Sequence, residues 1–264
     1  MRKIIDVHTH IYPEAIAKKA VASIAGFYGI DTTYADGTID SLIGFCRQAE
    51  VVKAVVHSVA TSPRQVESIN SFIAATAKEH ALFLPFATLH PMMSEQEIKR
   101  EYARIKELSM KGIKLHPDCQ KFALDGQNAA RLFGCLDGEL PIMVHTGDPR
   151  YQFSNPNKMI SVAKNFTHLR FVAAHFGGWS EWDETGGYRG LKNVWFDTSS
   201  TLAFVPPQRA REMIESLGED RFMFGSDYPM WNAPDELRRL AALELPEDVE
   251  EKILYGNAAR FFNL

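Results

Sequence analysis

Short apolar segments alternate with longer amphipathic segments from one end of the chain to the other. The apolar segments are nearly continuous runs rather than alternations of apolar and polar residues. Such runs are typical of parallel strands that are buried on both faces. We expect eight strands, at residues 4–10, 54–60, 83–90, 112–116, 141–146, 170–175, 194–199 and 222–227.

Helix signals lie between these runs. Ser94 and Glu97 form a capping box, Pro207 and Gly218 bracket an amphipathic stretch, and acidic residues follow Pro246. Eight strands, each followed by a helical segment, predict an α/β protein of the (β/α)8 TIM-barrel class, with one domain over residues 1–264. An open doubly wound sheet is the alternative, but the Gly-rich phosphate loop that it often carries after its first strand is absent from the sequence.

One connection is long. Residues 12–52 contain two helix-like stretches, 14–25 and 38–50, around a loop at 26–37. In a barrel this inserted segment would leave the top of the first strand. There it could fold over the mouth of the barrel, or it could be a longer connection without a functional part.

The composition narrows the class of partner. The 264 residues carry a net charge of −4, are 45% hydrophobic and 23% charged, and include three cysteines. This balance gives no basic surface for nucleic acid and no polybasic patch for a membrane. The sequence shows no signal peptide and no stretch of membrane-spanning length, so we expect a cytoplasmic protein with reduced thiols that acts on a small molecule.

His8 and His10 stand two residues apart at the end of the first predicted strand. Side chains two apart in a strand point to the same side, so the two imidazoles form half of a metal site. A histidine pair on an apolar strand can equally be a hydrogen-bonded part of the core. The metal interpretation therefore depends on further ligands at the ends of other strands.

Other strands do end in such residues. In a barrel, the carboxyl ends of the strands form the active face. His90, His116, His145 and His175 end the third to sixth predicted strands, and Asp227 ends the eighth. Asp197 ends the seventh and is a weaker candidate. His57 is expected inside the second strand, and His80 and His168, at helix ends, are expected to be structural.

These motifs resemble those of the amidohydrolase superfamily, in particular its amidohydrolase 2 branch. That branch also contains the aminocarboxymuconate-semialdehyde and resorcylate decarboxylases. The resemblance covers nearly the whole chain and lies in six motifs: Asp-Val-His-Thr-His at 6–10, Gly-Ile-Lys-Leu-His-Pro at 112–117, Val-His-Thr-Gly at 144–147, Ala-His-Phe-Gly-Gly at 174–178, Phe-Gly-Ser-Asp-Tyr-Pro at 224–229 and Gly-Asn-Ala-Ala-Arg at 256–260. The phosphoesterases of the PHP class and the TatD-like nucleases fit these motifs less well.

The resemblance implies a role for each matching residue. His8, His10, His145 and Asp227 are the implied ligands of one divalent metal ion, with Zn²⁺ expected and Mn²⁺ as the alternative. Asp227 and His175 are the implied catalytic residues. Lys114 matches the position of a metal-bridging residue in binuclear relatives, but we favour a single metal ion and a substrate-binding role. The family is compatible with a homodimer.

Three functions remain open. The first is a hydrolase in which metal-activated water attacks an ester, lactone or amide, with Asp227 handling the proton. The N–H groups of Gly177 and Gly178 could then help His175 to stabilise the developing charge. The second is a non-oxidative decarboxylase of a small aromatic or unsaturated acid, and the third is a non-catalytic metal-binding barrel. The residues expected to bind substrate are His116, Lys114, Trp179 and Arg150.

Overall fold

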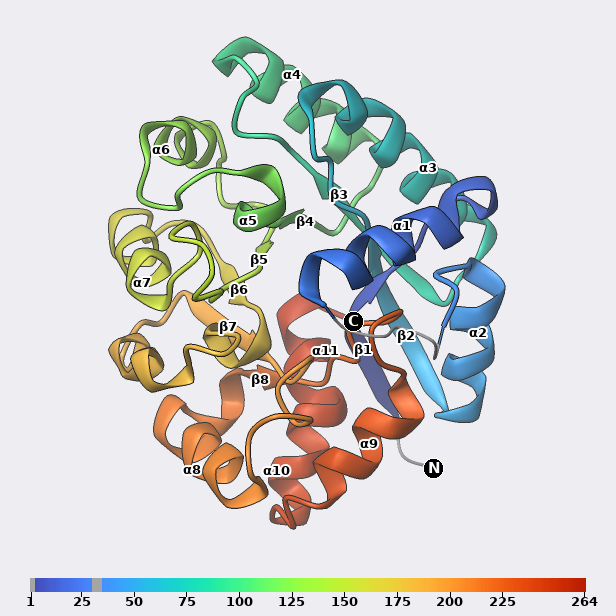
Figure 1. Ribbon diagram of the computed structural model, residues 1–264, viewed down its shortest axis with the longest axis vertical. Coiled ribbons are helices and arrows are strands. Elements are labelled where there is room, and N and C mark those ends of the chain that lie inside the picture. The colour runs from blue at the N-terminus through green and yellow to red at the C-terminus, as the bar shows by residue number, and fades with distance from the viewer. Residues whose placement is uncertain (1–2, 30–34) are drawn as a thin grey trace. The chain divides into compact units, whose positions relative to one another are not determined.

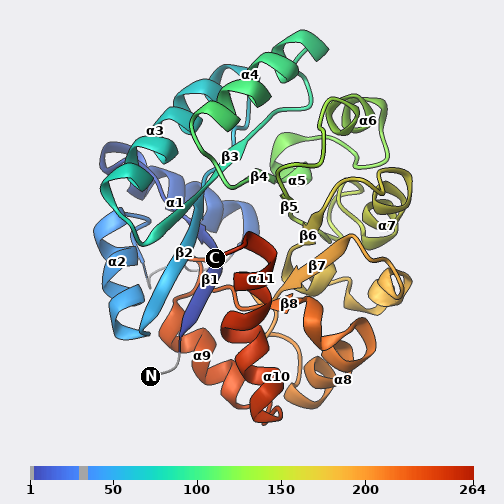
Figure 2. The same cartoon turned by 180° about the vertical axis from the view of Figure 1, so that it is seen from behind.

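The computed structural model describes residues 3–29 and 35–264. Its eight strands follow one another in the sheet in chain order, from β1 to β8 (Figures 1 and 2). An α-helix follows each strand except β6, which is followed by two 3-10 helices in the described chain. This order confirms the (β/α)8 TIM-barrel class.

The strands are β1 Ile4–His10, β2 Val51–His57, β3 Phe83–Thr88, β4 Gly112–Leu115, β5 Ile142–Val144, β6 Phe171–Ala173, β7 Val194–Asp197 and β8 Phe222–Met223. The α-helices are α1 Glu14–Tyr28, α2 Ile39–Gln48, α3 Val66–Glu79, α4 Glu95–Glu107, α5 Pro117–Gln120, α6 Gln127–Gly134, α7 Pro156–Asn165, α8 Pro207–Leu217, α9 Ala233–Ala241, α10 Glu247–Glu251 and α11 Asn257–Phe262. The 3-10 helices after β6 are His175–Gly177 and Trp182–Tyr188, and a π-helical turn spans Lys252–Gly256.

The chain divides into two compact units. The first unit comprises residues 1–57 and 198–264, and it contains β1, β2 and β8. Strands β1 and β2 pair in parallel, with His10 opposite His57. Helix α11 packs against β1, so an element near the end of the chain lies beside the first strand (Figures 1 and 2). The side chains of Ile5, Val7 and Phe224 are completely buried in this unit.

The second unit comprises residues 58–197 and contains five parallel strands, β3 to β7. Helices α3, α4, α6 and α7 lie along one side of these strands (Figure 1). All residues of β3 to β6 are buried. Burial on both faces of a strand requires apolar residues at successive positions, which explains the nearly continuous apolar runs.

The predicted helix ends are confirmed. Ser94 and Glu97 form both hydrogen bonds of the capping box at the start of α4. Helix α8 begins at Pro207 and ends before Gly218, whose φ of 104° suits a residue without a side chain. Helix α10 begins directly after Pro246.

The predicted second strand is wrong by three residues at each end. Strand β2 begins at Val51 and ends at His57, so His57 closes the strand instead of lying inside it. Helices α1 and α2 match the two helical stretches predicted between the first two strands. Part of the predicted loop between them, residues 30–34, lies outside the described residues, and a role of this segment at the barrel mouth stays a prediction. The three cysteines carry free thiols. Within the described residues, no helix combines the length and the apolar character needed to cross a membrane.

Candidate active site

In the first unit, the backbone brings Asp227 to the end of β1. The N–H of Asp227 donates to the carbonyl of His8 over 2.8 Å, and the N–H of His10 donates to the carbonyl of Tyr228 over 2.7 Å. Asp227 has a φ of 59°, a value that is uncommon outside glycine. These contacts turn its side chain towards the two histidines.

The carboxylate of Asp227 lies between the two imidazoles of the His-x-His pair. Its Oδ1 atom is 3.4 Å from Nε2 of His8 and 3.4 Å from Nε2 of His10. Two ligand atoms bound tetrahedrally to one ion, each at about 2.1 Å, are about 3.4 Å apart. The spacing therefore fits a divalent metal ion that shares these three residues.

The other nitrogen of His8 also has a partner. Its Nδ1 atom is 3.0 Å from Oγ of Ser199. A proton on Nδ1 leaves the lone pair on Nε2, which is the tautomer that a metal ligand needs. The buried Asp6 accepts hydrogen bonds from the N–H groups of His8 and Ser226 and so joins β1 to the segment that carries Asp227.

A third histidine belongs to this group. The ring of His57 meets the rings of His8 and His10 edge-on, with ring centres 5.0 Å and 4.3 Å away. The three imidazoles are close enough together to hold a metal ion. The sequence analysis missed this residue because it placed the end of the second strand three residues too late. The His-x-His pair and a histidine at the true end of β2 are the signal that could have found it.

In the second unit, His145 and His175 are in contact. Nε2 of His175 is 3.0 Å from Nδ1 of His145, and Nε2 of His145 is 3.0 Å from the carbonyl oxygen of Gly147. His116 stacks on His145, with ring centres 3.9 Å apart and ring planes within 9°. Three predicted site histidines thus form one cluster in this unit.

The backbone at His175 is unusual. His175 and Phe176 have φ values of 60° and 55°, although neither is glycine. Asp197 accepts a hydrogen bond from the N–H of His175, and the indole of Trp182 donates to its carbonyl oxygen. Backbone strain that is held by specific contacts is common at functional sites. Asp197 therefore helps to hold the backbone at His175 through this hydrogen bond.

The N–H groups of Gly177 and Gly178 are not directed at a substrate. They donate to the carbonyl oxygens of Ala174 and His175 over 3.0 Å and 3.2 Å. The expectation that they help to stabilise negative charge is therefore wrong. Both N–H groups form backbone hydrogen bonds within the tight turn after β6.

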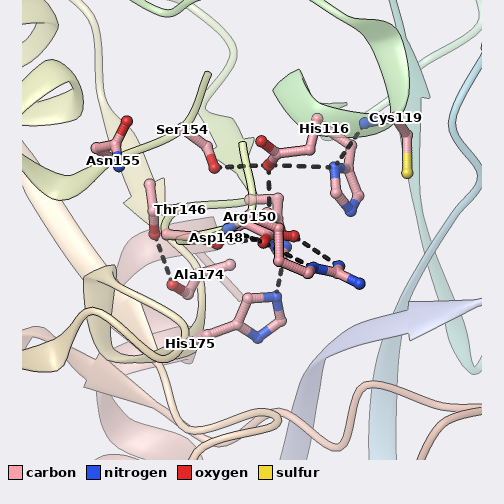
Figure 3. Close-up of polar contacts among 12 residues, drawn as sticks. His116, Cys119, Thr146, Asp148, Arg150, Ser154, Asn155, Ala174 and His175 are labelled. Atoms are coloured by element: carbon pink, nitrogen blue, oxygen red, sulfur yellow. Dashed lines mark hydrogen bonds and ion pairs between the residues drawn. The ribbon is translucent and has the colours of Figure 1, made fainter. Parts of the chain in front are cut away.

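Asp118 is a further acidic residue beside these histidines. Its Oδ2 atom accepts a hydrogen bond from Ser154 over 2.5 Å and is 3.8 Å from Nε2 of His145 and 4.0 Å from Nδ1 of His116. Figure 3 shows the side chains of Ser154 and His116, each with a dashed line that marks its contact. Burial raises the pKa of Asp118 to about 7. The sequence analysis missed Asp118, which stands in a one-turn helix after the predicted fourth strand.

The predicted substrate-binding residues of this unit differ in their surroundings. Lys114 is buried in β4. Arg150 uses its Nε and Nη2 atoms on the two oxygens of the buried Asp148, over 2.9 Å and 2.8 Å. The guanidinium of Arg150 also lies 5.8 Å from the ring of Trp179.

Sequence comparison places the chain among known proteins. A family model described as amidohydrolase, Amidohydro_2, matches residues 5–264. The chain belongs to this family. None of the curated proteins that were compared matches this amidohydrolase-family chain.

Solved structures share its fold over the full length. 5-Carboxyvanillate decarboxylase LigW from Sphingomonas paucimobilis has a TM-score of 0.75 at 16% identity, with 100% of both chains covered. An uncharacterised TIM-barrel protein from Bordetella bronchiseptica has a TM-score of 0.78 at 20% identity, covering 99% of this chain and 98% of its own. A dihydroxybenzoic acid decarboxylase from Polaromonas sp. JS666, with bound manganese and 2-nitroresorcinol, has a TM-score of 0.75 at 16% identity, covering 100% and 98%.

The structure of this amidohydrolase-family protein groups the predicted site residues by unit. His8, His10 and Asp227 come together in the first unit, and His145, His175 and His116 come together in the second. The donor set of the first unit, two imidazoles and one carboxylate, is one that Zn²⁺ and Mn²⁺ both accept. Each unit thus holds one part of the predicted machinery.

Proposed function

We propose that this protein is a metal-dependent decarboxylase that releases CO₂ from a small aromatic or unsaturated carboxylic acid without oxidation. The observation that carries the proposal is the likeness, over at least 98% of both chains, to decarboxylases of 5-carboxyvanillate and of dihydroxybenzoates. These likenesses favour decarboxylation over the hydrolysis that was the first expectation from the sequence.

One divalent metal ion is the proposed cofactor. Its proposed ligands in the first unit are His8, His10 and Asp227, whose carboxylate lies 3.4 Å from both imidazole nitrogens. His145, in the second unit, is the fourth ligand predicted from the sequence. Three of the similar structures, all decarboxylases, hold manganese, which makes Mn²⁺ as good a candidate as Zn²⁺. When bound, such an ion polarises substrate oxygens and orients the substrate.

A residue of the chain would supply the proton that replaces the lost carboxylate. In decarboxylation the bond between the ring or alkene carbon and the carboxylate breaks, and its electron pair stays on carbon. That carbon must then receive one proton before the product leaves. His175, whose Nε2 lies at hydrogen-bond distance from His145, is the proposed donor, and Asp227 is the alternative.

Four residues are proposed to bind the substrate. Lys114 and Arg150 supply positive charge for a carboxylate, although Asp148 balances the charge of Arg150. The flat faces of His116 and Trp179 suit an aromatic ring. A planar, unsaturated carboxylic acid would match both the positive charges and the flat ring faces of these residues.

Product analysis tests the proposal. The purified protein, loaded with Mn²⁺ or Zn²⁺, is incubated in D₂O with dihydroxybenzoates, 5-carboxyvanillate and a muconate-like acid, and in parallel with an ester, a lactone and an amide. We expect CO₂ release and one deuterium on the carbon that lost the carboxylate. Cleavage of the ester, lactone or amide without CO₂ release from any acid would establish the hydrolase instead. Metal binding without turnover of any substrate would support the non-catalytic barrel.

A further inference from the structure

A chain of hydrogen bonds leads from a partly exposed tryptophan to Asp227. All of its members belong to the first unit. The indole Nε1 of Trp231 is 3.0 Å from Oγ of Ser200, and Oγ of Ser200 is hydrogen-bonded to Oδ2 of Asp227. The other carboxylate oxygen, Oδ1, is the one that lies 3.4 Å from His8 and His10.

The chemistry of the three groups fixes the direction of these bonds. An indole N–H can only donate, so Ser200 must accept from Trp231. The hydroxyl of Ser200 has a single proton, and that proton is directed to Oδ2 of Asp227. An ionised carboxylate accepts it well, because hydrogen bonds to charged acceptors are the stronger ones. Trp231 therefore determines how the hydroxyl of Ser200 is oriented.

The surroundings hold each member in place. Ser200 is buried and has a φ of 48°, and Asp227 has a φ of 59°. Both residues thus have a positive φ, in the left-handed region of the backbone that residues other than glycine seldom adopt. The ring of Trp231 lies between two neighbours, with the guanidinium of Arg239 4.6 Å from its centre and the ring of Phe204 5.9 Å away.

We propose that Ser200 and Trp231 are positioning residues that hold Asp227 by Oδ2 and so leave Oδ1 alone to face the two histidines. Asp227 then binds the metal ion through one oxygen, and the bond from Ser200 prevents the carboxylate from rotating to offer both. This inference rests on the proposed metal site. Contacts of this kind to a ligand usually change metal affinity by about 10- to 100-fold.

Metal affinity tests the proposal without a need for turnover. Dissociation constants for Mn²⁺ and Zn²⁺ are measured by competition with a chromophoric chelator for the unsubstituted protein, S200A and W231F. We expect S200A to bind about tenfold or more weakly. W231F keeps an aromatic ring beside Arg239 but replaces the indole and its N–H donor by a smaller ring, and Ser200 stays in place, so we expect a smaller loss, about fivefold. S68A removes an exposed hydroxyl in the second unit, W195F removes a different indole, and both should bind as the unsubstituted protein does.

A signal from the indole itself separates positioning from a general loss of stability. The four tryptophans give four indole N–H resonances in protein with ¹⁵N-labelled tryptophan, and W231F identifies the one of Trp231. We expect Zn²⁺ to shift this resonance in the unsubstituted protein and to leave it in place in folded S200A. Thermal unfolding of each variant confirms that it is folded.

The outcomes are distinct. If the unsubstituted protein binds metal and releases CO₂ while S200A and W231F match it in affinity, the positioning role is wrong and the proposed function stands. If the indole resonance of Trp231 in the unsubstituted protein does not shift when Zn²⁺ is added, the positioning role is also wrong. Failure of the unsubstituted protein to bind any divalent metal overturns both inferences together.

Discussion

Nε2 of His175 lies 3.0 Å from Nδ1 of His145. The carbonyl of Gly147 can only accept a hydrogen bond, so Nε2 of His145 carries the proton and Nδ1 carries the lone pair. That lone pair accepts the N–H of His175. It cannot accept this proton and bind a metal ion at the same time. If His145 binds a metal ion through Nδ1, as the sequence predicts, its contact with His175 is lost and the N–H of His175 becomes available to a substrate.

This relationship predicts the behaviour of His175→Asn. Asparagine tolerates the positive φ of residue 175, so the backbone should remain intact. We expect kcat for CO₂ release to fall by about 100-fold or more, because the proposed proton donor is lost, while the metal content stays at the level of the unsubstituted protein. Metal analysis and steady-state kinetics measure the two effects. H168N, at a histidine outside the cluster, should retain full activity, and equal activity of H175N would remove His175 from the mechanism.

The ligands proposed in the first unit predict the metal content directly. Purified protein should hold about one divalent ion per chain, and the H8A/H10A double variant and D227N should each hold less than about a tenth of that. The reason is that Oδ1 of Asp227 is 3.4 Å from both imidazoles: the double variant removes the two imidazole nitrogens, and D227N removes the negative charge of the carboxylate. Elemental analysis checks the prediction, with H80A, at the end of α3, as the control. Unchanged metal in both ligand variants would place the ion elsewhere.

The positive charges of the second unit predict a preference for acids. We expect K114M to raise the inhibition constant of a substituted benzoate by about tenfold, while that of the corresponding neutral benzamide stays the same. R150M leaves the carboxylate of Asp148 buried without its partner, so it should also lower the unfolding temperature. The double variant D148N/R150M should recover that stability, which separates binding from folding. Equal losses for benzoate and benzamide would mean that neither cation recognises the carboxylate.

The sequence predicts the strand count well and the strand ends poorly. All eight strands appear, because most residues of each apolar run are buried. Strand β8 covers only Phe222 and Met223, since the chain then turns so that Asp227 reaches the left-handed region. Strand β2 begins at Val51, three residues before the predicted start. Its second residue, Val52, is exposed, so the start of the strand lacks the pattern of a continuous buried run.

The residues of the candidate site also divide into some that the sequence predicts and others that it does not. The grouping of His8, His10 and Asp227 is predictable, because histidine and aspartate are typical ligand types and these residues follow buried strands. Asp118, Ser154, Ser200 and the bond from Trp231 to Ser200 are not, because they depend on how loops bring distant residues together. Neither spacing nor composition in the sequence fixes the path of those loops.

Gly147 is a position where a single methyl group should disturb the second unit. It has a φ of 84°, and a Cβ atom there would lie 2.5 Å from the backbone of Gly178 and Trp179. The backbone on both sides would have to move. We expect G147A to lower the free energy of unfolding by about 2 kcal/mol or more and to disturb the contact of Gly147 with His145. Denaturant unfolding measures the effect, and G186A, where a Cβ meets nothing within 4 Å, is the control. Equal stability of G147A and G186A would contradict the prediction.

Glu236 predicts how stability changes with pH. Its side chain is completely buried in the first unit, and Oε2 has no hydrogen-bond partner among the described residues, although Arg239 pairs with the carboxylate. Burial raises the pKa of Glu236 from 4.5 to about 8, against the opposing effect of Arg239. The folded protein therefore keeps a proton between these pH values that the unfolded chain has released. The stability from this proton is complete below about pH 4.5 and is lost as the pH rises through about 8.

The variant E236Q cannot lose that proton. We expect its unfolding temperature to rise relative to that of the unsubstituted protein as the pH increases from 5 to 9, by several degrees over the range. Arg239 keeps its contact with the ring of Trp231 in this variant, so its charge is not left without a neighbour. Calorimetry in the presence of a chelator measures the difference without a contribution from metal binding. E247Q, at an exposed glutamate in α10, should follow the unsubstituted protein at every pH. A difference between E236Q and the unsubstituted protein that stays constant from pH 5 to 9 would show that Glu236 is ionised in the folded protein throughout this range.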